Sequence, residues 1–405
     1  MEVGRRALLF TSLAHFLNDG TTLLFPVLLT YYVEIPGTSV TVLGLMAVIY
    51  NVISGLFSAP VGVVADRIDR DNVLISTGLL LNALAIFIFA LPFLFERFAL
   101  YLIVAGVASL GFGQSFYHPV GASVLSGVYR KGGGAPRAMG INGSFGSLGR
   151  AITPLLIVSL IALLRPSHSL FILAGYTAVG GVAVLLGLRR VRRSAPSANR
   201  GERKRVPLGR YRSFILLLTS LVFIRSMFLL GSTTFVPDYL DLIYGSKALM
   251  GDLLTTSMVI AVMGQPFFGH VVTRIGGKAT VMITFILSTL FFTLFMYYSK
   301  SVILAGVFYS LFAFTAYTQF PVLLGYVGRV VPREVNTTSN SMVWGVGQTV
   351  GGAAGIAFIS LMDKVIPLWT AIWFSILFAV VTSFIMPLLP SDRGEPVADG
   401  GALKA

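Results

Sequence analysis

A short polar stretch, HFLNDG at residues 15–20, interrupts the first apolar segment of the chain. His15, Asn18, Asp19 and Thr22 are spaced i, i+3, i+4 and i+7, so on a helix they form one stripe. Burial favours the neutral acid form of an aspartate, whereas a neighbouring cation favours the carboxylate, so Asp19 can change protonation with its surroundings. The sequence therefore predicts that Asp19 couples a proton to function and that His15, one turn away, relays or senses it.

Two arginines are expected at the same depth as Asp19. Arg150 and Arg225 each lie about 12 residues inside an apolar segment, which at 1.5 Å per residue is roughly 18 Å. A charge at that depth costs roughly 2.5–3.5 kcal/mol, and guanidinium groups suit carboxylate or phosphonate ligands. We expect Arg150 and Arg225 to bind an anionic substrate. A structural Asp19–Arg150 ion pair is the alternative.

Other polar residues in apolar segments extend this candidate site. Asn18, Gln114 and His118 are predicted to contact substrate, with Gln114 four residues before His118. His118 is about 28 Å from the outer end of its segment, near the cytoplasmic mouth, where a capping or packing role is equally expected. Asn340, Trp344 and Gln348, spaced i, i+4 and i+8, are predicted to hold helices together.

The bulk composition explains why these polar residues stand out. Of 405 residues, 55% are hydrophobic and 11% are charged, against about 25% charged in soluble domains. Apolar runs long enough to cross a bilayer recur along the chain. They predict an all-α membrane protein with twelve transmembrane helices, near residues 7–33, 41–65, 72–94, 98–118, 138–164, 168–188, 213–238, 249–273, 278–298, 301–327, 337–362 and 367–389.

Composition and spacing also argue against several functions. The net charge is +14, but the basic residues fall between the spans, so we expect no nucleic-acid partner. There is no cysteine, and the four histidines lack metal-binding spacing, so neither a metal nor a cofactor is expected. Without a Walker loop or a nucleophile–base motif, the chain is not expected to be an enzyme.

Lys and Arg are concentrated in one of the two sets of loops. This bias places both termini in the cytoplasm of a multi-pass protein, which we expect in the plasma membrane. The basic stretch 189–212 separates the spans into six and six. The predicted domains are an N-terminal six-helix half (1–188), a basic cytoplasmic linker (189–212), a C-terminal six-helix half (213–390) and a cytoplasmic tail (391–405).

The two halves repeat some of their sequence. GVVADRIDRDNVL (62–74) joins spans 2 and 3, and GHVVTRIGGKATV (269–281) joins spans 8 and 9. Gly143 and Gly149 match Gly345 and Gly351, which predicts close helix packing in both halves. Charges crowded at helix ends can stabilise one conformation and release it in another. The predicted conformational-switch residues are Gly62, Asp66, Arg67, Arg70, Gly269 and Arg274.

Twelve spans in two halves, with GxxxDRxxR between spans 2 and 3, resemble the major facilitator superfamily. Within it, AHFLNDG, GFGQSFYHPVGASVLS (111–126) and the glycine-rich start of span 5 look like the fosmidomycin-resistance group of drug exporters. The resemblance implies two pseudo-symmetric six-helix halves that work by alternating access, with a substrate site between them.

Residues and resemblance together predict a secondary transporter for proton-coupled efflux of a small organic, anionic compound or drug. The alternative is a symporter or uniporter that imports an organic anion or a sugar derivative. A channel is disfavoured because channels commonly use symmetric subunits around a narrow filter. The expected partners are a small-molecule substrate, protons and the lipid bilayer, and we expect a monomer.

Overall fold

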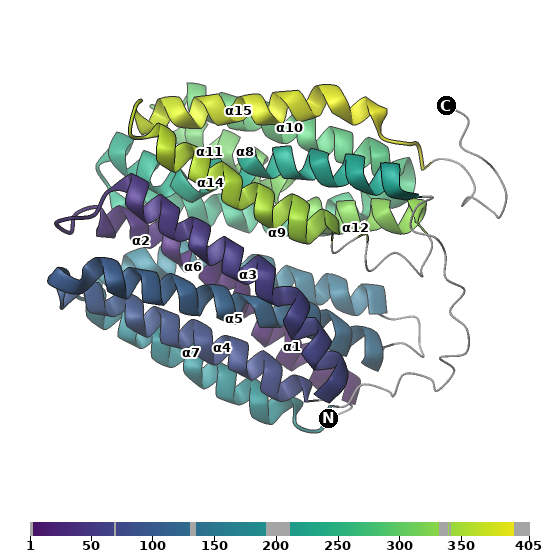
Figure 1. Ribbon diagram of the computed structural model, residues 1–405, viewed down its shortest axis with the longest axis horizontal. Coiled ribbons are helices and arrows are strands. Elements are labelled where there is room, and N and C mark those ends of the chain that lie inside the picture. The colour runs from purple at the N-terminus through teal and green to yellow at the C-terminus, as the bar shows by residue number, and fades with distance from the viewer. Residues whose placement is uncertain are drawn as a thin grey trace.

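In a computed structural model, the chain forms a bundle of long helices (Figure 1). The structure describes residues 3–68, 70–129, 135–191, 211–331, 339 and 342–392, and it contains no strand within these ranges. The predicted all-α fold is confirmed. The predicted linker 189–212 and tail 391–405 lie mostly outside the described residues.

The helices form two sets, and in Figure 1 the N-terminal set lies below the C-terminal set. The N-terminal set contains α1 (Val3–Gly20), η1 (Thr21–Leu23), α2 (Leu24–Tyr32), α3 (Val40–Ile68), α4 (Asp71–Ala90), α5 (Ala99–Val128), α6 (Ala135–Leu163) and α7 (Pro166–Leu188). The C-terminal set contains α8 (Arg212–Tyr244), α9 (Lys247–Ile275), α10 (Gly277–Tyr297), α11 (Val302–Ala316), α12 (Gln319–Val330), the π-helix η6 (Met342–Val350), α14 (Gly351–Met362) and α15 (Leu368–Ile385). Short 3₁₀ turns, η2 (Leu91–Phe93), η3 (Glu96–Phe98) and η7 (Met386–Leu388), complete the described elements.

Both described chain ends lie on the same side of the bundle, on the right of Figure 1, which we call the terminal side. Within the described ranges, ten helices are long and apolar enough to cross a membrane. The first and tenth predicted spans are helical but interrupted, by η1 and by the turn between α11 and α12. Each predicted segment thus coincides with helix in its described part, in agreement with a twelve-helix fold.

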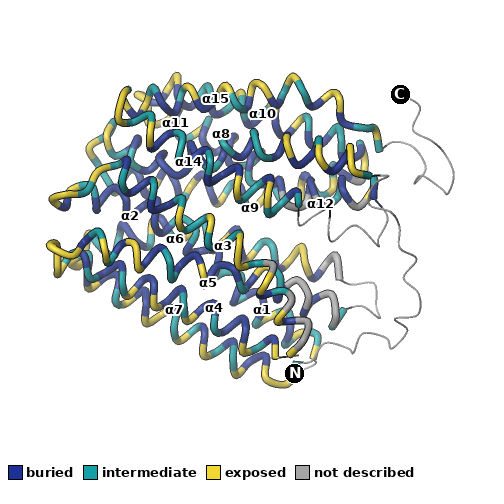
Figure 2. Tube along the Cα trace, in the orientation of Figure 1, coloured by how far each residue is buried: buried dark blue, intermediate teal, exposed yellow. Residues whose placement is uncertain are grey.

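Large apolar side chains cover the outside of the bundle as well as its interior. Figure 2 shows exposed residues along the outer helices, and Leu84, Phe87, Val179 and Leu377 are among the large apolar ones. Such extensive apolar exposure is rare on a soluble monomer. It is the surface expected of a protein whose outer face contacts lipid.

The two sets meet closely on the side opposite the termini. There the Thr41 hydroxyl, at the start of α3, donates a hydrogen bond of 3.4 Å to the Asp363 carboxylate, just after α14. Gly44 lies against the Ser360 side chain and the Phe235 ring, so a larger residue would overlap the C-terminal set. Lys247 at the start of α9 forms an ion pair with Glu34 after α2. These contacts close the bundle on that side.

We expect Gly44→Leu to separate the sets on the side opposite the termini, because its side chain would occupy the space of Ser360 and Phe235. The chain lacks cysteine, so Thr41→Cys and Asp363→Cys can be joined by a short thiol crosslinker. With a coupling energy of about 1–3 kcal/mol between the Gly44 contact and the closed arrangement of the two sets, Gly44→Leu should slow this crosslink by about 5-fold or more.

Gly175→Leu is the matched control for this experiment. No atom lies within 4 Å of a Cβ added at Gly175, so this variant should crosslink at the parent rate. Equal rates for Gly44→Leu and Gly175→Leu would mean that the approach at Gly44 does not limit opening.

Candidate functional site

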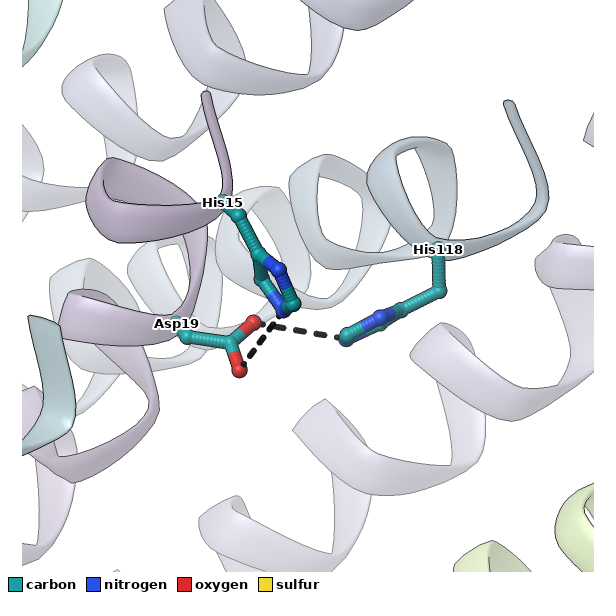
Figure 3. Close-up of side chains that lie close together, drawn as sticks. All are labelled: His15, Asp19 and His118. Carbon is teal, nitrogen blue, oxygen red and sulfur yellow. Dashed lines mark ion pairs between the residues drawn. The ribbon is translucent and has the colours of Figure 1, made fainter. Parts of the chain in front are cut away.

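Asp19 is the centre of the candidate site. Its side chain lies on a membrane-spanning segment and is only 1% exposed. Its Oδ2 lies 2.5 Å from Arg150 Nη1 and 3.2 Å from His15 Nε2, and its Oδ1 lies 3.4 Å from His118 Nε2. Figure 3 shows the two imidazole rings turned toward the carboxylate. The predicted proximity of His15 and Arg150 to Asp19 is therefore present in the structure.

Glycines on α6 allow this cluster to form. A Cβ at Gly149 would overlap the Phe16 carbonyl oxygen and approach Gly20, and a Cβ at Gly146 would overlap the His15 ring. Without side chains at these positions, the α6 backbone packs directly on α1, as small residues permit in membrane helices. Arg150 follows Gly149, so this close packing brings its guanidinium group to Asp19.

A hydrogen-bond network on its far side fixes the ring of His15. His15 Nδ1 lies 2.9 Å from both the carbonyl oxygen and the Oδ1 of Asn142. The Tyr117 hydroxyl donates to the Thr11 carbonyl oxygen and lies 3.0 Å from Asn142 Oδ1. Because a backbone carbonyl only accepts hydrogen bonds, His15 Nδ1 must carry a hydrogen.

This tautomer has a consequence for Asp19. With a hydrogen on Nδ1, the Nε2 of a neutral His15 presents only a lone pair to Asp19 Oδ2, 3.2 Å away. A lone pair and a carboxylate oxygen repel each other, so this contact is favourable when Nε2 donates a hydrogen to the carboxylate. The geometry therefore aims the Nε2 of His15 at Asp19 Oδ2.

His118 lies deeper than its position in the apolar segment suggested. We expected span 4 to end at residue 118, but α5 continues to Val128. The hydroxyl of Tyr129, just after α5, donates to the Gly4 carbonyl oxygen on α1, so these two helix ends are level. His118 and His15 are each 11 residues from this contact, and so they lie at similar depth. The expected place at the helix mouth is wrong, because α5 extends beyond its most apolar part.

Asn18 and Gln114 hold α1 and α5 together inside the N-terminal set. Asn18 Nδ2 donates to Gln114 Oε1 at 2.9 Å, and Gln114 Nε2 donates to the Asn18 carbonyl oxygen at 2.6 Å. Asn82 Nδ2 on α4 donates to Asn18 Oδ1 at 3.3 Å. Asn18 is fully buried and Gln114 is 4% exposed. The predicted stripe on α1 is thus divided, and these amides contact other helices in this conformation.

Arg225 does not join the Asp19 cluster. It is fully buried inside the C-terminal set, where one Nη donates to the Ser288 hydroxyl on α10. Its guanidinium carbon lies 4.6 Å from the Phe228 ring centroid and 5.1 Å from that of Phe285. Its Nε and Nη1 have no hydrogen-bond partner among the described residues. The expected arrangement of three charges around one site is therefore not observed in this conformation.

The internal repeat explains this orientation. Gly149 packs on the Phe16 carbonyl, and Gly351 packs in the same way on the Phe223 carbonyl. In the internal repeat, α1 therefore corresponds to α8, and Asn18 corresponds to Arg225. Both side chains point into their own set, Asn18 toward Asn82 and Arg225 toward Ser288. Ser226 then corresponds to Asp19, and its hydroxyl donates to Gln348 at 2.8 Å, which confirms a helix-to-helix contact for Gln348.

The predicted switch residues lie on the terminal side of the bundle. Gly62 is near the end of α3, and Arg70, which is exposed, directly precedes α4. Gly269 and the exposed Arg274 lie in the last two turns of α9. The side chains of Asp66 and Arg67 are outside the described part of the chain. A conformational role for this group stays a prediction.

Asp392 is a contact that the sequence analysis missed, since it fell in the predicted tail. Its carboxylate accepts hydrogen bonds from the backbone N–H groups of Gly277 and Lys278, at 2.5 and 3.2 Å. Its Oδ2 also lies 3.7 Å from Arg329 Nη1. An acid at a helix N-terminus stabilises the helix through its dipole. The repeated motif has Thr273 near the end of α9 where it has Asp66 near the end of α3, and Asp392 supplies a carboxylate to the start of α10.

His15, Asp19 and His118 could hold a metal ion by geometry alone. The ligand atoms of His15, Asp19 and His118 lie within 4.8 Å of one another. However, Asp19 Oδ2 already forms an ion pair with Arg150 Nη1. A divalent cation added beside that guanidinium group would be repelled. The donor set therefore fits protons better than a metal.

Comparisons with known proteins agree with this architecture. The sequence profile of the Major Facilitator Superfamily matches residues 8–246 and 220–404. The chain belongs to the major facilitator superfamily. It is therefore a multi-pass membrane transporter of the secondary type and not an enzyme.

Solved structures of this superfamily share the fold at low sequence identity. A D-xylose–proton symporter is 13% identical with a TM-score of 0.75, covering 98% of this chain and 99% of that one. A POT family transporter in complex with a thioalcohol-conjugated peptide is 15% identical with a TM-score of 0.74, covering 95% and 96%. A bacterial homologue of the human lysosomal transporter Spinster is 13% identical with a TM-score of 0.71, covering 94% and 96%. No curated protein matches the sequence.

We predict that Arg225→Met keeps or raises the melting temperature of the purified protein. Taking a single charge out of water costs several kcal/mol, and this cost is removed when an apolar residue of similar volume replaces the arginine. Arg225→Lys should lower the melting temperature, because it keeps the charge but loses the planar face that lies on two phenylalanine rings. Intrinsic fluorescence during heating measures both variants. A clear loss of stability in Arg225→Met would mean that the guanidinium group stabilises the fold.

Proposed function

We propose that this superfamily member couples the movement of protons to that of a small organic anion. The observation that carries this proposal is the buried Asp19 carboxylate, which one guanidinium and two imidazole groups contact at 2.5–3.4 Å. Each of these groups changes its interactions when Asp19 takes up a proton. The carboxylate is therefore the coupling group, and the neighbouring side chains respond to its charge.

Arg150 connects the proton to the substrate in this mechanism. Its side chain is 20% exposed, and its Nη1 is bound to Asp19. Protonation of Asp19 removes the charge that holds Arg150, so the proton and the charge of an anionic substrate act on the same guanidinium group. Tyr50 on α3 and Tyr317, after α11, lie within electrostatic reach of Arg150. A compact anion with an apolar part would fit between such groups.

Export is the first candidate for the direction of transport. The stretches AHFLNDG and GFGQSFYHPVGASVLS and the glycine-rich start of α6 resemble the fosmidomycin-resistance group of drug exporters. On this basis the substrate leaves the cell in exchange for protons. The glycines of α6 have an independent role in packing α6 on α1.

A second candidate, proton symport of an organic anion, has its own support. Asp19 and a substrate anion would compete for the same arginine, because Arg150 is the cation nearest to Asp19. Protonation of Asp19 would then strengthen anion binding, so proton and anion would cross together. In exchange, by contrast, proton binding must weaken substrate binding.

The setting of the transporter follows from its charge distribution. Lys and Arg concentrate in loops of the terminal side, so we place this side in the cytoplasm. The chain would act as a monomer in the plasma membrane, with the N-terminal half at 1–188 and the C-terminal half at 213–390. The basic linker 189–212 and the tail 391–405 would then lie in the cytoplasm.

A thermal-shift screen tests the substrate class and the sign of coupling together. Small carboxylates and phosphonates are added to the purified protein, because a ligand that binds the folded state raises its melting point. Symport predicts larger shifts as pH falls, and exchange predicts larger shifts as pH rises. Arg150→Gln should remove the shift, and Asp19→Asn should make it independent of pH. A shift from organic cations alone would contradict the proposal.

Asp19→Asn tests proton coupling itself. Asparagine keeps the size and the hydrogen bonding of Asp19 but cannot be ionised. In proteoliposomes, uphill transport of an anion from the screen, driven by a pH gradient, should be lost. Exchange of labelled for unlabelled anion should continue. Intact gradient-driven transport in Asp19→Asn would remove Asp19 from the mechanism.

A further inference from the structure

We infer that His118, and not His15, passes the proton between water and Asp19. This inference rests on the proposed function, in which Asp19 takes up and releases a proton. His15 precedes Asp19 by one turn, so the sequence favours it as the relay. The contacts of the two rings point to the opposite assignment.

His15 has no open route for a proton. Its side chain is 13% exposed, and its Nδ1 is held by the carbonyl oxygen and the Oδ1 of Asn142. The Tyr117 ring lies 4.6 Å from the His15 ring between centroids. A proton on Nδ1 is bonded to acceptors that do not release protons, and Nε2 faces Asp19 and the backbone of Gly146. His15 therefore stabilises the charge of Asp19 and exchanges no proton with water.

His118 has the two contacts that a relay requires. Its Nε2 lies 3.4 Å from Asp19 Oδ1, the carboxylate oxygen that neither Arg150 nor His15 contacts. Its side chain is 46% exposed, while it lies at the depth of His15. An imidazole that exchanges charge with a carboxylate is unfavourable against lipid chains. We therefore assign its exposed edge to water between the two sets of helices.

The transfer itself conserves every proton. A hydronium ion at the exposed edge gives a proton to Nδ1 of a neutral His118 that carries its hydrogen on Nε2, and leaves as water. Nε2 then gives its own proton to Asp19 Oδ1. His118 ends neutral with the hydrogen on Nδ1, and it returns to its first tautomer by exchange with water. Asp19 becomes a neutral acid, which weakens its contact with Arg150.

Within the described part of the chain, few charged or titratable groups lie around Asp19. They are His15 on α1, His118 and Tyr117 on α5, Arg150 on α6 and Tyr50 on α3. Tyrosine and arginine side chains in water release their protons only at about pH 10 or higher, whereas imidazole does so near neutral pH. Only the histidines are therefore suited to exchange a proton with Asp19 in this range.

Infrared spectroscopy tests this inference without a known substrate. Protonated Asp19 in the purified, lipid-reconstituted protein has a carboxylic acid C=O band, identified by its loss in Asp19→Asn. A light-activated caged acid lowers the pH, and the rise of the band reports the rate of protonation. His118→Gln should slow this rise on the order of 10²-fold, the scale of a missing acid–base group. His15→Gln should change the pH midpoint of the band and leave its rate nearly unchanged.

Chemical rescue separates a proton relay from a structural role. In His118→Ala, free imidazole can enter the exposed position and should restore the rate. In His15→Ala, the enclosed position should show no rescue. His168→Gln, at the start of α7 and away from Asp19, is the control for loss of a histidine.

The outcomes distinguish the inference from the proposed function. If no band is lost in Asp19→Asn, Asp19 does not titrate and the proposed function fails. If the band is present but its rate depends on His15 and not on His118, the proposed function stands and this inference is overturned. A slow rise in His118→Ala that imidazole does not restore would likewise overturn the inference.

Discussion

The buried carboxylate of Asp19 imposes the constraint on which the rest of this structure depends. An ionised group in a membrane-spanning segment is costly unless other groups compensate its charge. Here the compensation comes from three helices, through His15 on α1, His118 on α5 and Arg150 on α6. Arg150 reaches this carboxylate because Gly146 and Gly149 let α6 pack on α1. The helix packing and the charge cluster are therefore one feature.

The two sets of helices share this packing but not its chemistry. Gly351 packs on Phe223 in the C-terminal set, as Gly149 packs on Phe16. Where the N-terminal set has Asp19, the C-terminal set has Ser226, which forms a neutral hydrogen bond with Gln348. Arg225 lies at the position of Asn18 and points inward. The repeat thus sets the direction of each side chain, and the residue at each position determines whether it carries charge.

Hydropathy was sufficient to predict the spans, and depth along a helix was sufficient to bring Asp19 and Arg150 together. Depth alone does not fix the direction of a side chain around the helix axis, which is why Arg225 was expected beside Asp19. The same limit applies to Asn18. It was expected to face the substrate together with Asp19, but its side chain contacts Gln114 instead. The depth of His118 was misjudged because α5 continues for ten residues past the predicted end. The contacts of Asn142 with His15 and of Ser147 with Arg150 were not predicted, because single polar residues in a glycine-rich segment are common.

The charge cluster lies entirely within the N-terminal set, so a rocking motion of the two sets would not by itself disturb it. A signal from Asp19 must therefore reach the C-terminal set through a side chain that contacts both. Ser147 meets this requirement: its hydroxyl oxygen accepts hydrogen bonds from Arg150 Nη2 at 3.1 Å and from Gln265 Nε2 on α9 at 2.6 Å. A hydroxyl oxygen has two lone pairs, so both bonds can exist together. When Arg150 leaves Asp19, its hold on Ser147 changes as well, and with it a polar contact between α6 and α9. The proton site thus contacts the opposite set through one hydroxyl group.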